Sequence, residues 1–129
     1  MRPIDADALK LMLDPPDDIV LGVCPRKNTK EGKTAMIKMD SNGYQDSYCY
    51  SELPEGRTEV KAGGFACALV KTSVFYLLQN PLFSYAINRD QSTLSEDFYF
   101  CKKARAAGLR IYMDSRVRCG HLARYYQYE

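Results

Sequence analysis

The chain has no tryptophan and only one histidine, His121. A single imidazole excludes metal motifs that need two histidines, such as HExxH. No apolar run approaches the roughly 20 residues that a bilayer span requires, and the segment Met1–Asp5 has no apolar signal core. These absences predict a cytoplasmic protein without a membrane span.

Strong charge bias is also missing, since 18 lysines and arginines face 16 acidic residues in a chain of net charge +2. This balance argues against nucleic acid as a partner. The five cysteines are odd in number and contain no CxxC pair, so a zinc ribbon and a complete disulfide framework are both excluded. We expect reduced thiols, most of them small core residues.

At 129 residues the chain is expected to form one domain, residues 1–129, with an α/β fold and a mixed sheet flanked by helices. Proline and glycine positions, apolar periodicity and alternation place the elements. The expected helices span 5–13, 74–79 and 96–107, and the expected strands span 19–24, 34–39, 58–61, 63–70 and 109–113. Ser41-Asn42-Gly43 predicts a hairpin, Asp114-Ser115 predicts a turn, and 82–93 is a connection without clear periodicity.

Two acidic residues, Glu96 and Asp97, follow Ser95, a good helix N-cap. The helix dipole favours negative charge in a first turn. A positioned carboxylate there can accept a proton from a sugar hydroxyl as that oxygen attacks. The alternative is an acidic first turn that only stabilises its helix. Likewise His121 is a candidate metal ligand, and a structural or exposed histidine is the alternative.

The order of motifs resembles the C-terminal half of family 2-like glycosyltransferases with the GT-A fold. Three anchors carry the resemblance: the 18–23 strand, the 63–70 strand with its following helix start at 72–75, and the 95–121 segment. By this resemblance Asp97 is the catalytic base, Glu96 orients the acceptor, and Gly63 and Gly64 border the substrate pockets. The implied substrates are a nucleotide-sugar donor and an acceptor hydroxyl.

The resemblance also implies a divalent cation, Mn²⁺ or Mg²⁺, which His121 would help to bind. Asp5-Ala6-Asp7 looks like the Asp-X-Asp metal motif of these enzymes, because paired carboxylates suit hard cations. However, the family motif closes an apolar strand, and only Met1–Ile4 precedes it here. Asp5 and Asp7 are therefore expected to cap a helix rather than to bind metal.

The family's N-terminal nucleotide-binding half has no counterpart in this sequence. We therefore expect the isolated chain to be inactive, and an exposed sheet edge to permit a homodimer. A non-catalytic sugar-binding or interaction module is the alternative. A hydrolase using Glu96 with Asp97 is a third reading, but adjacent helical residues point about 100° apart, whereas glycoside cleavage needs facing carboxylates.

Overall fold

The computed structural model describes residues 2–3, 7–26, 32–87 and 93–120. Its main sheet has the strand order β5–β10–β2–β7, and β1 pairs with the far end of β10. Only β10 and β2 run parallel, and the other neighbours are antiparallel. The strands are β1 (Arg2–Pro3), β2 (Ile19–Val23), β5 (Arg57–Val60), β7 (Ala68–Val70) and β10 (Ile111–Gly120). The predicted α/β fold with a mixed sheet is confirmed.

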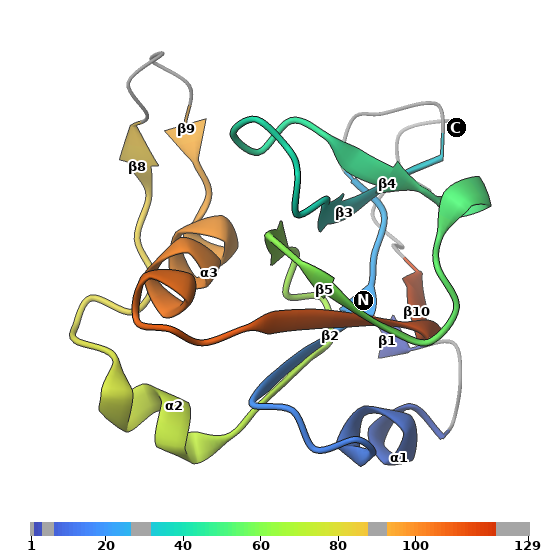
Figure 1. The fold of residues 1–129 in the computed structure, drawn as a ribbon, viewed down its shortest axis with the longest axis horizontal. Helices are drawn as coiled ribbons and strands as arrows, with labels where there is room; N and C mark the ends of the chain where they lie inside the picture. Colours follow the sequence, from blue (N-terminus) through green and yellow to red (C-terminus); the bar gives the residue numbers. More distant parts are fainter. Residues whose placement is uncertain (1, 4–6, 27–31, 88–92, 121–129) are drawn as a thin grey trace, which may run out of the picture.

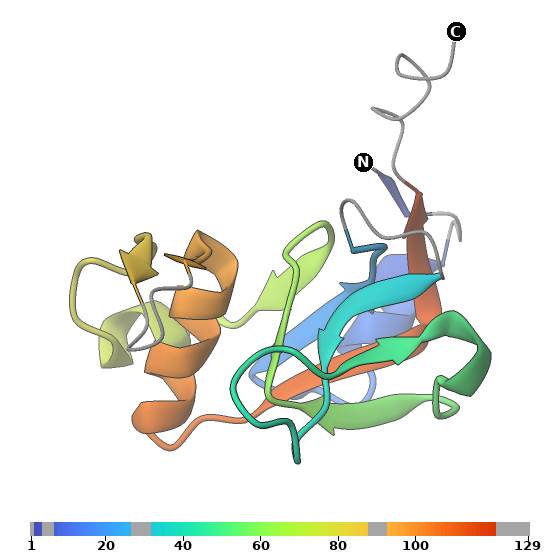
Figure 2. The same cartoon turned by 90° about the horizontal axis from the view of Figure 1, so that it is seen from above.

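A smaller antiparallel sheet has the order β4–β3–β6, and β8 pairs with β9. Figure 2 shows that α2, α3 and the β8–β9 pair lie together on one side, with the two larger sheets on the other. These strands are β3 (Lys33–Ile37), β4 (Ser47–Cys49), β6 (Ala62–Gly63), β8 (Ala86–Ile87) and β9 (Thr93–Leu94). The helices are α1 (Ala8–Leu13), α2 (Thr72–Leu77) and α3 (Glu96–Ala106), with a 3₁₀ turn, η1 (Tyr50–Glu52).

The main sheet separates two apolar clusters, which explains why every residue of β2 is buried. Alternate side chains of a strand point to opposite faces. Ile19 and Leu21 therefore enter the larger cluster beside α3, whereas Val20 packs with Met12 of α1. In Figure 1, α1 and α3 accordingly lie on opposite sides of β2 and β10. A strand buried on both faces reads as a continuous apolar run in the sequence.

Local sequence signals correctly predict α3 and the hairpin. Ser95 is the N-cap of α3, and Gly108 follows its C-cap with φ +90°, a conformation that favours glycine. The hairpin joins β3 to β4 through a turn in which Gly43 has φ +76°. Helix α1 is shorter than predicted and begins after Asp7.

Two predictions of local structure are wrong. The expected single strand 63–70 is two strands in different sheets, because the chain leaves the small sheet after Gly63 and joins β2 only at Ala68. The expected turn at Asp114-Ser115 is instead continuous β10, with a register shift against β2 between Asp114 and Arg118. There Asp114 pairs with Arg57 of β5, so a tertiary ion pair overrides a local turn signal.

No helix among the described residues is both long and apolar enough to cross a bilayer.

Candidate functional site

Three hydrogen bonds hold Asp97 in place, two from the start of α3 and one from the β6–β7 loop. Ser95 Oγ donates to Asp97 Oδ1 at 2.6 Å, and the Phe98 backbone N–H donates to the same oxygen at 3.0 Å. Asp97 Oδ2 accepts a longer bond, 3.4 Å, from the backbone N–H of Phe65. Asp97 thus ties the start of α3 to the loop between β6 and β7, and Oδ2 keeps the greater capacity to accept another donor.

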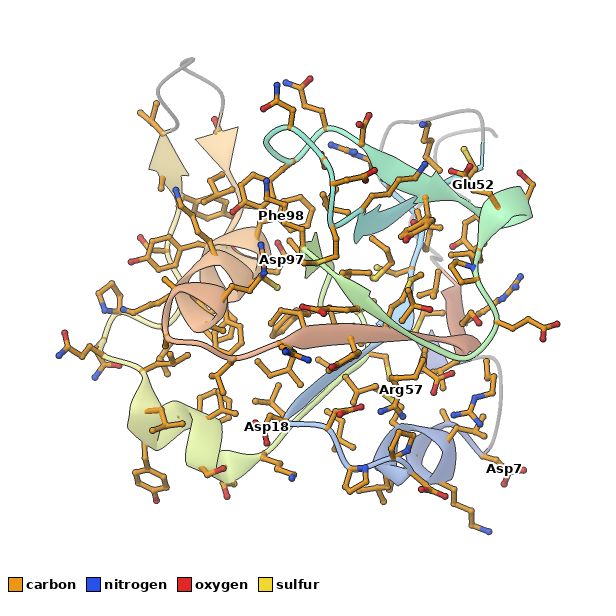
Figure 3. All side chains as sticks on the ribbon, viewed as in Figure 1. Asp7, Asp18, Glu52, Arg57, Asp97 and Phe98 are labelled. Atoms are coloured by element: carbon orange, nitrogen blue, oxygen red, sulfur yellow. The ribbon has the colours of Figure 1, made fainter. Side chains whose placement is uncertain are left out.

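Asp97 and Glu96 line an open cleft of about 830 Å³. One wall comes from the start of α3 and the other from the end of β2 and the β6–β7 loop, where Gly64 and Phe65 lie. Figure 3 shows Asp97 and Phe98 together at the N-terminal end of α3, facing the small sheet. Arg26 adds a cation to the lining, with Nη1 3.4 Å from Ser47 Oγ. The cleft therefore combines carboxylates and a guanidinium with apolar surface, as ligand sites commonly do.

Aromatic rings form much of the apolar surface of the cleft. Phe65 packs edge-on against Phe83 and Phe100, with centroid distances of 5.9 and 5.3 Å. Phe83 stacks on Phe100 at 4.9 Å, and Phe98 stacks on Tyr44 at 5.7 Å. Phe65, Phe83 and Phe98 all line the cleft, so a ligand beside Asp97 would meet ring faces or edges held by the core.

Tyr85 brings the β8 segment to the acidic pair. A hydrogen bond to the Glu96 carboxylate, reinforced by its negative charge, raises the pKa of the Tyr85 hydroxyl. Tyr85 is 68% exposed, so its phenol reaches the cleft from the solvent side. Glu96 is exposed and Asp97 is half-buried, which places the two predicted site residues in different surroundings within one cleft.

The two glycines predicted to border the substrate have different positions. Gly64 lines the cleft, and a Cβ there would lie 2.8 Å from Cys24 Sγ and 3.2 Å from Ala35 Cβ. Gly63 instead faces the core, where a Cβ would lie 2.6 Å from Leu21 Cδ1. Close backbone approach therefore explains both glycines, and only Gly64 is placed to meet a ligand.

The described residues do not assemble a complete site for Mn²⁺ or Mg²⁺. They contain no group of three or more histidine, cysteine, aspartate or glutamate side chains that could hold a metal ion. Asp7 is exposed at the N-cap position of α1, remote from Asp97 (Figure 3). The predicted capping by its side chain is wrong, because that side chain makes no capping hydrogen bond there. His121 and Asp5 lie outside the described residues.

Sequence reasoning missed the aromatic part of the cleft. Phe83 and Tyr85 lie in the 82–93 connection, which shows no periodicity from which contacts could be inferred. The only signal was its length, because long connections are often functional. Arg26 belongs to a short basic stretch of the sequence, residues 26–33, and such a stretch is more often a solvated loop than a ligand site.

Comparisons with known proteins give one informative likeness. No family model matches the sequence, and no curated protein matches it. Among solved structures, the crystal structure of A197 from STIV is similar, with a TM-score of 0.57 and 20% sequence identity. The match covers 93% of this chain and 52% of that chain, so this chain spans about half the length of the structure it matches. At this identity, the likeness shows the fold alone.

Proposed function

We propose that the protein is glycosyltransferase-like and that its cleft places an acceptor hydroxyl beside Asp97 for transfer of a sugar from a nucleotide-sugar donor. The observation that carries this proposal is the position of Asp97: its carboxylate is fixed at a helix start, inside a cleft lined by aromatic rings. The order of sequence motifs across 18–121 also supports a glycosyltransferase-like protein.

In the proposed reaction the acceptor oxygen attacks the anomeric carbon of the donor sugar. A carbon–oxygen bond forms there as the bond to the departing diphosphate breaks, and Asp97 Oδ2 takes the hydroxyl proton. Glu96, at the cleft mouth with Tyr85, orients the acceptor. The proposal also includes a divalent cation, Mn²⁺ or Mg²⁺, that His121 would help to bind. The charge of that cation would favour departure of the diphosphate.

Calorimetry with UDP- and GDP-sugars, with and without Mn²⁺, tests the donor part of the proposal. We expect saturable binding that requires Mn²⁺ and that His121→Ala abolishes. Asp97→Asn removes the proposed base but keeps a similar shape, so it should retain donor binding. Because the isolated chain is expected to be inactive, binding rather than transfer is measured, and Asp40→Asn, at an exposed position, is the matched control that should also retain it. Donor affinity that is unchanged by omitting Mn²⁺ and by His121→Ala would contradict the metal assignment.

A non-catalytic sugar-binding module is the second candidate. It is favoured by the three hydrogen bonds of Asp97, which also serve to fasten the β6–β7 loop to α3. In that case oligosaccharides should bind without a nucleotide, and Phe65→Ala should weaken binding more than Asp97→Asn.

The proposal also includes a cytoplasmic location and a homodimer formed through a sheet edge, with no nucleic-acid partner. All five cysteines are free thiols, which suits a reducing compartment. Fractionation of cells that express the full-length protein would test the location.

A further inference from the structure

Cys67 lies beside two other sulfur-bearing side chains, away from the residues assigned above: Met12 of the smaller apolar cluster and Cys119 of the larger one. Met12 belongs to α1, Cys67 to the β6–β7 connection and Cys119 to β10. Cys67 Sγ lies 3.7 Å from Met12 Sδ, and the side chains of Cys67 and Cys119 both approach the same point above Gly22. Cys67 is thus the centre of the cluster.

Gly22 of β2 makes room for this convergence. A Cβ at Gly22 would lie 3.2 Å from Cys67 Cβ and 3.4 Å from Cys119 Sγ. The two cysteine side chains therefore meet over the one β2 residue that has no side chain. Met12 is 2% and Cys119 3% exposed, whereas Cys67 is half-buried, so solvent reaches the cluster through Cys67.

We propose that Met12, Cys67 and Cys119 form a binding site for monovalent copper. Thiolate and thioether sulfurs are soft ligands that select Cu(I), and Cu(I) accepts two or three of them. A structural zinc ion would instead need four ligands, and hard cations need oxygen ligands. The proposal is independent of glycosyl transfer and uses no residue assigned to the cleft.

In the proposed binding reaction, Cu(I) replaces the protons of the two thiols. Each cysteine loses its thiol proton to the solvent as a Cu–S bond forms, so one Cu(I) ion releases two protons. Met12 adds its neutral thioether without a proton change. No electron is transferred, and the ion enters and remains as Cu(I).

The test is an anaerobic titration of the reduced full chain with Cu(I), in competition with the chromogenic chelator bathocuproine disulfonate. We expect one ion per chain at this site. Cys67→Ala and Cys119→Ala should each weaken binding by about 100-fold or more, and Met12→Leu by about 10-fold. Cys49→Ala removes a thiol outside the cluster and should leave the affinity unchanged.

Two further measurements make the result decisive. Circular dichroism identifies variants that remain folded, and Cys67→Ser supplies a second, gentler change at the half-buried position. X-ray absorption at the copper edge should show sulfur neighbours only. Equal loss in Cys49→Ala, or full affinity in folded Cys67→Ala and Cys67→Ser, would overturn the assignment, as would nitrogen or oxygen in the copper shell.

Discussion

Arg57 joins helix α1 to the main sheet through five hydrogen bonds. Its guanidinium donates to the buried carboxylate of Asp114 at 3.2 Å and to Asp17 at 2.7 Å. It also donates to the carbonyls of Leu11 and Met12, at the end of α1, where a helix leaves acceptors unsatisfied. Few cations could replace this planar set of donors (Figure 3).

Replacing Arg57 by alanine should destabilise the protein strongly. Asp114 has no exposed side-chain surface, and breaking a buried ion pair costs about 3–5 kcal/mol. Arg116 still pairs with Asp114 in the variant, so the loss should fall at or below that range and include the four hydrogen bonds from Arg57 to Asp17 and to backbone carbonyls at and just after the end of α1. Urea denaturation would measure this loss. Lys71→Ala is the control, since Lys71 and Asp18 form an exposed pair that should contribute less than about 1 kcal/mol. Equal effects of the two changes would contradict the buried-pair interpretation.

Asp114 should also make the free energy of unfolding depend on pH. Burial acts to raise its pKa, but hydrogen bonds and charge from Arg116, with a hydrogen bond from Arg57, outweigh burial and hold the pKa below its usual value of 3.8. A carboxyl group with a depressed pKa stabilises the fold above its unfolded-state pKa and loses that contribution as the pH falls through its folded-state pKa.

The wild type should therefore be more stable than Asp114→Asn at neutral pH, and the difference should shrink below about pH 3.8. Urea denaturation of both proteins from about pH 7 to about pH 2 would measure this difference. A gap of constant size across that range would show that the loss of the carboxylate charge does not cause the lower stability of the variant.

At the scale of elements, the cleft depends on how closely the β6–β7 loop approaches β2 and α3. Gly64→Ala would place a Cβ 2.8 Å from Cys24 Sγ and 3.2 Å from Ala35 Cβ. Overpacking of this kind costs about 1–3 kcal/mol, and movement of the loop would lengthen the bond from Phe65 N–H to Asp97. Thermal unfolding should show the loss, whereas Gly120→Ala, with open space around it, should remain close to wild type.

Local chemistry predicts the elements that depend on it. Helix α3 follows from Ser95 and Gly108, and β2 from its continuous apolar run, because capping, φ preference and burial act within a few residues. The break between β6 and β7 is not visible locally, since Gly63 and Ala68 are close in sequence but pair with strands of different sheets.

The candidate site likewise contains some residues that local sequence predicts and others that only tertiary packing brings together. Glu96 and Asp97 could be predicted, because their helix is local in origin. The ring contacts of Phe83 and the approach of Tyr85 to Glu96 depend on how the 82–87 segment folds against α3. No apolar periodicity in that segment predicts this packing. Asp114 looked like a turn residue because its partner Arg57 is remote in sequence.

At the scale of the whole molecule, the main sheet has open edges in its described part. β7 pairs with β2 through Ala68, Leu69 and Val70, and its other side has no partner strand among the described residues. An unpaired edge offers backbone donors and acceptors to another chain. Ala68 is exposed, so no side chain shields that end of the edge. This geometry is the physical basis for the proposed homodimer.

Ala68→Lys tests that assembly, because a charged side chain on an edge strand opposes edge-to-edge pairing. If two copies pair through β7, sedimentation velocity over a range of concentrations should detect a dimer that Ala68→Lys weakens by about 10-fold or more, which is about 1.4 kcal/mol.

Ala106→Lys places the same charge at an exposed position on α3 and should leave the dimer intact. A dimer that both variants preserve must use another surface, and a wild type that stays monomeric at every concentration would refute the assembly itself. Because neither alanine is buried, both variants should unfold near the wild-type temperature, so a change in sedimentation would report association rather than loss of the fold.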